Sequence, residues 1–302
     1  MNIMYHGTDA DGWASAFIVD YYGKERDENE TTFIALVRGK REIEISDLVP
    51  NTKIVIIDWS FNEANLDILD YIVDNNIDVL WIDHHKTSVE LLNKYPKYNK
   101  IKHVINTEYC AASLAYTYFT GRKYNMSPEW IQLISQYDTF NGITEKAKVF
   151  NFALKTSDTR PYSNHSIWYK LVSYHDVYPT FEHLIKLGTE LKHYEERQNH
   201  LYLKANAFEC TIHGIKCIAC NKMSNSMLFG SQYNEYPICC TFIFDGFKYK
   251  YTLYSNTTIF DVDCSKIAEE YGGGGHKGAA GFITDHIIFE NIKEIGFENN
   301  HE

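Results

Sequence analysis

Short apolar runs alternate with longer segments of helical periodicity over about the first 180 residues of the chain. The apolar runs cover residues 2–5, 33–37, 53–57 and 78–82, and the helical patterns cover residues 12–22, 62–75, 111–119 and 128–137. Such alternation is typical of an α/β domain, because each helix carries the chain back across the sheet to the next parallel strand. The sequence therefore predicts a mostly parallel sheet flanked by helices.

The character of the sequence changes near residue 180. Residues 181–207 are charged and amphipathic, with leucines at helical spacing, which predicts a long connecting helix. The strand-like runs beyond it cover residues 207–212, 216–219, 238–244 and 248–254. We therefore expect a first domain over residues 1–180, a helical connector over residues 181–207 and a smaller α/β domain over residues 208–302.

Composition and charge narrow the class of protein. Of the 302 residues, 44% are hydrophobic and 23% are charged, a balance found in ordinary globular domains. No apolar run approaches the roughly 20 residues that a membrane helix needs, and the N-terminus lacks the basic and apolar regions of a signal peptide. The formal net charge of −11 disfavours long duplex nucleic acid, which is bound through many Lys and Arg contacts to phosphates. We expect a cytoplasmic protein that does not enter a membrane.

The seven cysteines are expected to be buried and reduced, because their odd number and irregular spacing do not match a disulfide framework. Cys217 and Cys220 form a C-x-x-C pair that could indicate zinc or redox chemistry. Structural zinc sites usually need four well-spaced ligands, and no second pair with suitable spacing accompanies this one. Thiols buried in apolar strands are therefore the favoured interpretation.

Ionisable side chains follow three of the predicted strands, at the point where each strand ends. His6, Asp9 and Asp11 come after the first run, Asp58 after the third, and residues 83–85 (Asp-His-His) after the fourth. Because the carboxyl ends of parallel strands meet at one edge of a sheet, these groups should lie close together. Gathered carboxylates repel one another and are costly to bury, so cations are the simplest way to stabilise them.

The types of side chain indicate which metals would bind. Carboxylates and imidazoles without thiolates favour Mn²⁺, Mg²⁺ or Fe²⁺, and five or more such groups exceed the needs of one tetrahedral ion. Two neighbouring divalent ions can activate a water and stabilise attack at phosphorus. Simpler roles stay open for each residue taken alone: Asp11 and Asp58 could be helix caps or turn residues, and His84 and His85 could be ordinary histidines.

Several segments resemble the motifs of the DHH phosphoesterase superfamily. Residues 6–12 (HGTDADG), 57–58 (ID) and 82–87 (IDHHKT) are similar to the first three motifs, and Asp138 fits the fourth. Residues 272–282 (GGGGHKGAAGF) resemble the glycine-rich signature of the associated DHHA1 domain. The size and layout are most similar to the oligoribonuclease (nanoRNase) and short-nucleotide phosphodiesterase branch. The resemblance implies an active site in a cleft between the two domains.

The resemblance implies a set of ligands for two metal ions, with Mn²⁺ as the expected metal and Mg²⁺ or Fe²⁺ as alternatives. The first ion would be bound by His6, Asp9 and Asp58. The second would be bound by Asp11, Asp58, His84 and Asp138. Asp58 would therefore bridge the two ions.

The resemblance also implies catalytic and substrate-binding roles. Beside the bridging Asp58, His85 would face the scissile phosphate and Asp83 would orient a neighbouring histidine. In the DHHA1 domain, backbone N–H groups of the glycine run would approach a phosphate or a sugar. The substrate-binding residues expected there are Gly273, Gly274, Gly275, His276 and Lys277.

One position departs from the family pattern. Members of the family often carry an arginine before a serine upstream of the glycine run, whereas this chain has Tyr254-Ser255. Arg160, Lys86 or Lys277 could take over the contact with phosphate that this arginine would make.

Together these features predict a metal-dependent phosphoesterase that hydrolyses short oligonucleotides to mononucleotides, in the manner of an exonuclease. Two other activities would use the same site with a different pocket: a phosphatase of nucleoside bisphosphates, and a phosphodiesterase of cyclic or linear dinucleotides. A nucleotide-binding module without catalysis stays open as a function of another class. The expected partner is a short oligonucleotide or small nucleotide, and the chain could form a homodimer.

Overall fold

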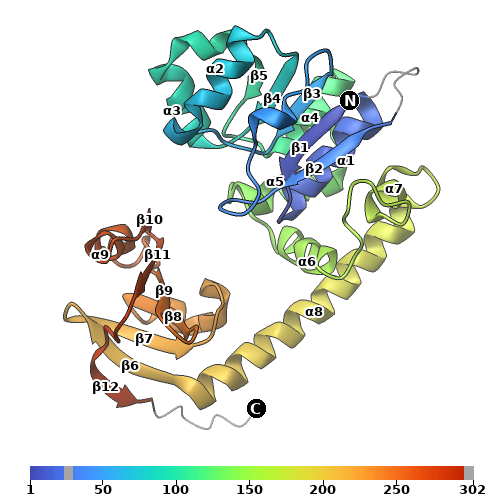
Figure 1. Ribbon diagram of the computed structural model, residues 1–302. Coiled ribbons are helices and arrows are strands. Elements are labelled where there is room, and N and C mark those ends of the chain that lie inside the picture. Colours follow the sequence, from blue (N-terminus) through green and yellow to red (C-terminus); the bar gives the residue numbers. More distant parts are fainter. Residues whose placement is uncertain (24–29, 296–302) are drawn as a thin grey trace. The chain divides into compact units, whose positions relative to one another are not determined.

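The computed structural model describes residues 1–23 and 30–295, which form two compact units (Figure 1). Unit 1 comprises Met1–Leu191 and unit 2 comprises Lys192–Glu302. The boundary falls inside α8 (Val177–Asn206), a helix of 30 residues that carries charged side chains along its length. In the part of the chain that the structure describes, no helix is both long enough and apolar enough to cross a membrane.

A five-stranded parallel sheet forms the centre of the described part of unit 1. In spatial order its strands are β2 (Thr32–Leu36), β1 (Asn2–His6), β3 (Ile54–Ile57), β4 (Val79–Asp83) and β5 (Lys102–Ile105). Every residue of β3 and β4 is buried, as expected for runs of Ile, Val and Leu that helices cover on both faces. The predicted mostly parallel sheet is confirmed.

Helices pack against both faces of this sheet (Figure 1). The core on one face includes α1 (Ala10–Gly23), α4 (Ala111–Thr120), α5 (Glu129–Asp138), α6 (Glu145–Leu154) and α7 (Ile167–Val172). The core on the other face includes α2 (Leu66–Asp74), α3 (Lys86–Lys94) and the 3₁₀ helix η3 (Pro96–Lys100). Further 3₁₀ turns are η1 (Ile45–Asp47), η2 (Glu63–Asn65) and η4 (Tyr124–Met126).

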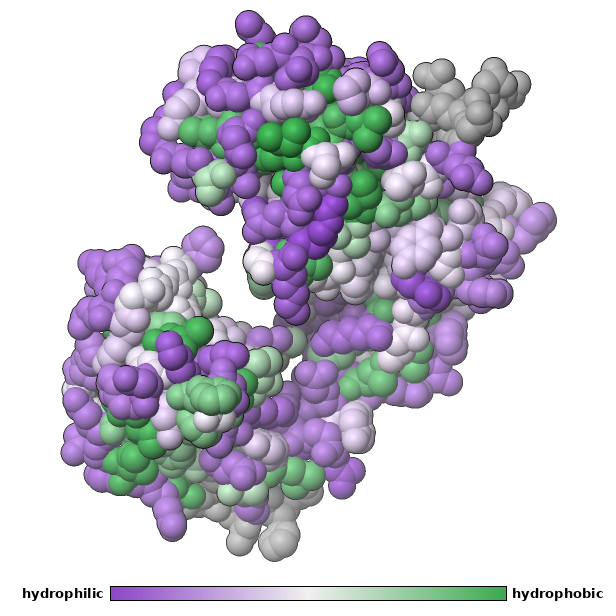
Figure 2. All heavy atoms as spheres, viewed as in Figure 1, coloured by the Kyte–Doolittle hydropathy of each residue, from purple (hydrophilic) through white to green (hydrophobic). Residues whose placement is uncertain are grey.

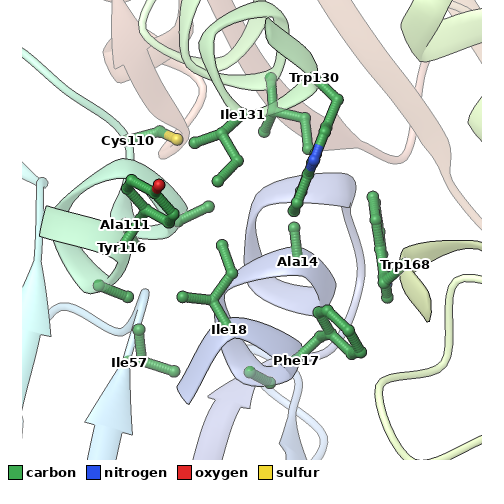
Figure 3. Packing of buried hydrophobic residues seen from close by; sticks show 14 of the residues in the cluster. Ala14, Phe17, Ile18, Ile57, Cys110, Ala111, Tyr116, Trp130, Ile131 and Trp168 are labelled. Atoms are coloured by element: carbon green, nitrogen blue, oxygen red, sulfur yellow. The ribbon is translucent and has the colours of Figure 1, made fainter. Parts of the chain in front are cut away.

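Successive side chains of each strand alternate between these two cores. In β1, Tyr5 enters the core beneath α1 and α4, whereas Met4 enters the core beneath α2. Figure 3 shows the first core, in which Trp130 stacks on Trp168 with their ring centroids 5.4 Å apart. Burying one aliphatic side chain in such a core stabilises the fold by about 1.5–3 kcal/mol. Hydrophilic side chains cover most of the face of each unit seen in Figure 2.

Unit 2 contains a seven-stranded mixed sheet with α9 (Cys264–Glu270) packed on it. In spatial order the strands are β10 (Gly274–His276), β11 (Ala279–Thr284), β9 (Tyr249–Tyr254), β8 (Ile238–Phe244), β7 (Ile215–Asn221), β6 (Ala207–Ile212) and β12 (Glu290–Glu294). Only β7 and β8 run parallel, and η5 (Ser226–Asn234) lies between them in the sequence. The expected second α/β domain is confirmed as a fold class.

All seven cysteines are buried and free of disulfides, and six of them lie in unit 2. Cys217 and Cys240 enter one core of that unit, whereas Cys220 enters the other. Among the described residues, the groups of side chains with metal-binding geometry contain no cysteine. The C-x-x-C pair is therefore part of a buried strand, in agreement with the favoured interpretation.

The glycine run ends α9 and begins the edge strand β10. The backbone N–H of Gly273 donates to the carbonyl of Ala268, 2.9 Å away, which closes the last turn of the helix. A side chain at Gly273 would collide with the backbone of Gly281 and with Phe282 on β11. Close packing therefore requires glycine at position 273, whatever ligand the run binds.

Some elements were not predicted from the sequence patterns, and they include the largely buried helix α6. They are α3, β5, α6, α7, β10, β11 and β12. In β12 every residue is exposed, and β5 begins with an exposed lysine, so neither strand has a clear alternation of apolar and polar residues.

Gly188 sets how closely α8 packs on α6 within unit 1. A Cβ atom at this position would overlap the carbonyl oxygen of Val149 and press against Ala153. We expect Gly188→Ala to lower the free energy of unfolding by about 1–3 kcal/mol, because the two helices must move apart to admit the methyl group. Chemical denaturation would measure the change. Lys186→Ala, at an exposed position on the same helix, is the control, and equal stability of the two variants would contradict the expectation.

Candidate metal centre

The order of strands in unit 1 creates a crevice at the carboxyl ends of β1 and β3. The chain passes from β1 to β2 on one side and then returns to β3 on the other side of β1. In doubly wound sheets of this order, the connections diverge at that point and leave room for a ligand. His6 ends β1, Asp58 follows β3 and Asp83 ends β4, so the predicted residues are gathered here.

His6, Asp9 and Asp58 form the first group of candidate ligands, with one ligand atom from each within 4.8 Å of the others. The His6 Nδ1 atom lies 2.9 Å from Asp9 Oδ2 and 3.5 Å from Asp58 Oδ2. The other oxygen of Asp9 accepts a hydrogen bond of 3.0 Å from the backbone N–H of Gly12. The structure therefore brings together the three residues expected to hold the first ion.

Asp11, His84 and Asp138 form the second group, in which ligand atoms again lie within 4.8 Å of one another. His84 Nε2 lies 3.2 Å from Asp138 Oδ2 and 3.7 Å from Asp11 Oδ2. It also lies 3.3 Å from Oδ1 of Asp58, whose Oδ2 faces His6. Asp58 thus presents one oxygen to each group, as a bridging ligand would.

The N-terminus of α4 fixes the orientation of Asp11. The backbone N–H groups of Ala111 and Ala112 donate one hydrogen bond to each carboxylate oxygen, both at 2.8 Å. These N–H groups lack partners inside the helix, and the helix dipole favours a negative charge at this end. The alternative that Asp11 caps the helix that follows it is wrong, because α1 begins at Ala10 and Asp9 is the residue that bonds its first turn.

Asp58 has a backbone conformation that few residue types tolerate. Its φ angle is 54°, in the left-handed region where Asp and Asn are more common than most other side chains. The neighbouring bonds hold it there: Asp58 N–H donates to Ile82 O at 3.0 Å, and the Trp81 indole N–H donates to Trp59 O at 2.9 Å. The loop after β3 is therefore fixed by β4, and it points the Asp58 carboxylate at both histidines.

Asp83 fixes the orientation of the His85 ring. The buried Asp83 carboxylate lies 2.7 Å from His85 Nδ1, and its second oxygen accepts a hydrogen bond from the hydroxyl of Ser88. This contact directs the opposite ring atom, Nε2, away from Asp83. His85 also belongs to a third group of candidate ligands, with Asp58 and His84, so it lies at the edge of the cluster.

Electrostatics in this centre favour a bound cation. Burial and the charge of Asp11 raise the pKa of Asp138 to about 7, and burial together with Asp58 raises the pKa of Asp11. Hydrogen bonds to Asp58 and Asp9 raise the pKa of His6 to about 10. Burial alone would lower the pKa of His84, but Asp58, Asp11 and Asp138 outweigh it and raise the value to about 10. The metal-free cluster therefore takes up protons to offset its negative charge.

The surroundings of one Asp138 oxygen indicate whether a metal ion fits the centre. Oδ2 of Asp138 is buried and has no hydrogen-bond partner, although it lies 3.2 Å from Nε2 of His84. A buried carboxylate oxygen without a partner is costly, and a cation removes that cost. The donors are carboxylate oxygens and imidazole nitrogens only, which suits Mn²⁺, Mg²⁺ or Fe²⁺. The residues therefore fit divalent ions.

The residues expected to bind substrate from the DHHA1-like segment lie in unit 2. Gly274, Gly275 and His276 form β10, and His276 is exposed. The side chain of Lys277 is paired with Asp261 at 2.8 Å. Their role in binding stays a prediction.

Arg38 is a candidate that the sequence patterns did not indicate. It follows the carboxyl end of β2, and its guanidinium lies 3.8 Å from the centre of the Trp59 ring. It also donates to Oγ of Ser60 at 2.8 Å, so the charge is held beside the loop that carries Asp58. By contrast, Arg160 is engaged by both oxygens of Asp158, at 2.8 and 2.7 Å. Only the position of Arg38 after a strand end could have suggested it.

Residues 1–137 match the family described as DHH family, N-terminal domain. This match covers less than half of the 302 residues and lies within unit 1. The expected class of enzyme, a phosphoesterase, is confirmed at this level, and the motifs around His6, Asp58 and Asp83 lie within the matched residues.

The relatives that match over most of the chain are distant in sequence. Uncharacterized protein R106 of Acanthamoeba polyphaga mimivirus is 23% identical over 317 residues, which cover 97% of this chain and 70% of that protein. A structure described as the DHH domain of a member of a family of ribosomal proteins has a TM-score of 0.59 at 14% identity and covers 96% of this chain and 82% of that one. A pGpG-specific phosphodiesterase from Vibrio cholerae has a TM-score of 0.51 at 14% identity and covers 94% and 92%. These similarities show a shared fold.

Binding of Mn²⁺ to the candidate centre of unit 1 should strengthen as the pH rises. A histidine ligand must be neutral, whereas His6 and His84 have pKa values near 10 in the metal-free centre and are therefore protonated at pH 7. Each proton displaced by the metal raises the apparent affinity about tenfold per pH unit below that pKa. Calorimetric titrations at pH 6.5, 7.5 and 8.5, in buffers of different ionisation enthalpy, would measure affinity and proton release. A constant affinity with no proton release would contradict the assignment of both histidines.

Proposed function

We propose that this chain is a two-metal phosphodiesterase that hydrolyses short oligonucleotides to mononucleotides. The observation that carries the proposal is the Asp58 carboxylate, which presents one oxygen to the group of His6 and Asp9 and the other to His84. Such a shared carboxylate is suited to two ions held close together. When bound, two such ions would activate a water and offset the negative charge that develops at phosphorus.

The proposed ligands follow the two groups of side chains. His6, Asp9 and Asp58 would hold one ion, and Asp11, Asp58, His84 and Asp138 would hold the other. Mn²⁺ is the proposed metal, as the resemblance to the DHH superfamily implies, and the set of imidazoles and carboxylates can hold it.

His85 is proposed to contact the phosphate that is cleaved. Its side chain is 43% exposed, so it can reach a substrate, while the buried Asp83 fixes its Nδ1 atom. Burial lowers the pKa of His85, but Asp83 outweighs that effect and raises it overall, which favours a proton on the ring. His85 Nε2–H would then donate to a phosphate oxygen, where charge accumulates during the reaction.

Short substrates are favoured by the overall charge. The net charge of −11 repels a long polyanion, whereas a dinucleotide needs only a few local cationic contacts. Arg38 would supply one such contact, because its guanidinium is already fixed on Trp59 and can bind phosphate oxygens in pairs. In unit 2, His276 and Lys277 with Gly273, Gly274 and Gly275 are proposed to bind the substrate as well. The dinucleotide named for the Vibrio cholerae structure is a substrate of this size.

A panel of substrates with Mn²⁺ tests the proposed activity. We expect turnover of RNA dinucleotides to pentanucleotides, with little hydrolysis of long single-stranded DNA or of 3′,5′-nucleoside bisphosphates. Preference for the bisphosphate would indicate a phosphatase, and preference for a cyclic dinucleotide would indicate a different phosphodiesterase. Nucleotide binding without any product would indicate a module that has lost catalysis.

Asp58→Asn should reduce kcat/KM by more than about 100-fold while the fold stays intact. Residues that merely support metal ligands already cost about 10–100-fold when replaced, and Asp58 would hold both ions. The amide keeps the size of the side chain and tolerates the positive φ angle of this position. Asp74→Asn, at an exposed position at the end of α2, is the matched control and should keep full activity. Full activity of Asp58→Asn would rule out a bridging role.

Arg38→Met should raise KM for a dinucleotide about tenfold or more and change kcat less. The methionine keeps the apolar contact with Trp59 but removes the charge-assisted hydrogen bonds to phosphate. Arg38→Lys should recover only part of the affinity, since an ammonium group neither stacks nor bonds in pairs. Steady-state kinetics would separate KM from kcat, and an unchanged KM in both variants would remove Arg38 from the binding site.

A further inference from the structure

A cavity of about 370 Å³ lies beside the candidate metal centre, entirely within unit 1. Asp9, Asp11 and Asp138 belong both to the centre and to the lining of this cavity. The other walls come from α1, α5 and α6, and from the segment that follows α6. The sequence motifs gave no indication of it, because most of its wall lies outside them.

The cavity has an acidic edge, formed by the three carboxylates, and walls of a different chemical character. Next to the carboxylates, the walls are largely apolar and include the aromatic residues Trp13 and Tyr137. One turn of α6 also contributes the amide of Asn151, which offers both hydrogen-bond donors and an acceptor. A ligand that fills this space therefore has a flat apolar part with polar edges, and its anionic part lies toward the metal ligands.

The volume and lining select one class of ligand. Pockets for small organic molecules usually start near 300 Å³ and combine apolar walls with a few polar groups. Proteins hold nucleobases by stacking them on aromatic side chains, and an amide side chain can bond the edge of a base. A sugar alone would leave the aromatic walls without a partner, and an aliphatic chain would leave the amide without one.

We propose that this cavity binds the base of the nucleotide next to the phosphate that is cleaved, an inference that rests on the proposed phosphodiesterase function. A base held there places its sugar and phosphate at the edge formed by Asp11 and Asp138. The cavity therefore sets which end of a short chain is cleaved and contributes to KM rather than to the chemical step.

The wall that α6 contributes is firmly supported. Its first turn is capped by Thr144, whose hydroxyl accepts from the N–H of Ala147 at 3.2 Å. Its outer side is packed on α8 at Gly188, where Val149 and Ala153 leave no room for a side chain. A stacked base would thus meet a wall that is already in place, which lowers the entropic cost of binding.

Two adjacent hydroxyl residues offer a matched pair of variants. Ser157 lines the cavity, whereas its neighbour Thr156 is exposed and does not line it. Both hydroxyls donate to the same carbonyl, that of Ala153, at 3.2 and 2.9 Å. Ser157→Trp should fill the cavity, and Thr156→Trp should add the same bulk to the surface at a similar cost to local stability.

The test measures KM and kcat of wild type and both variants in the presence of Mn²⁺. The substrates are an RNA dinucleotide and its two abasic analogues, each of which lacks one of the two bases. Wild type and Thr156→Trp should lose about fivefold or more in KM when one particular base is removed, since stacking of one base contributes that much. Ser157→Trp should have the raised KM already with the intact dinucleotide, and removal of that base should not raise KM further. Its kcat should stay within about twofold of wild type. If Ser157→Trp and Thr156→Trp have the same KM for the intact dinucleotide, the cavity does not bind a base.

Binding of nucleoside 5′-monophosphate separates this inference from the proposed function. If wild type hydrolyses no dinucleotide, the proposed function fails, yet calorimetric binding of 5′-AMP and 5′-GMP still tests the cavity. Binding to wild type and Thr156→Trp that is weakened at least about fivefold in Ser157→Trp would support it. Equal binding to all three proteins, or binding to none, would overturn it.

Discussion

Repulsion among buried carboxylates is the constraint on which the centre of unit 1 depends. Asp11, Asp58 and Asp138 lie around one imidazole nitrogen, and the first two are almost inaccessible to water. Burial raises the pKa of all three, and repulsion from a neighbouring carboxylate, which for Asp58 is that of Asp9, raises it further. The fold offsets this cost only in part, with two imidazoles and two backbone N–H groups. Divalent cations complete the compensation, and therefore the same residues that strain the metal-free protein stabilise the loaded one.

The two cores of unit 1 hold these charges in place. Strand residues alternate between them, so β1, β3 and β4 cannot slide by one position without moving their apolar side chains to the wrong face. The fixed register of the strands therefore also fixes the positions of the residues at their ends. Asp58 shows it most clearly, since bonds from β4 secure both its own backbone and the next residue.

The sequence predicted the part of the centre that follows from the sheet. His6 and Asp58 come directly after apolar runs and His84 follows one residue later, and parallel strands bring such positions together whatever the details of the loops. Asp138 was different: it ends a helix, and only the resemblance to a family indicated it. Arg38 and the cavity were missed, because both depend on contacts between segments that no local pattern records.

In unit 2, too, some features could be predicted from the sequence and others could not. The apolar strands β7 and β8 were predicted from their composition, whereas the exposed edge strand β12 was not. The glycine run was recognised as a motif, but its use in closing α9 and packing on β11 is a matter of tertiary contact.

The contact between Asp11 and the first turn of α4 has an evolutionary consequence. Both oxygens of this carboxylate are aligned by main-chain amides, at Ala111 and Ala112. Every residue except proline provides such an amide, so substitutions along α4 can accumulate without turning the carboxylate. The sequence of α4 can therefore change while the helix continues to orient the Asp11 carboxylate. Comparison of distant homologues would consequently underestimate the contribution of this helix to the metal centre.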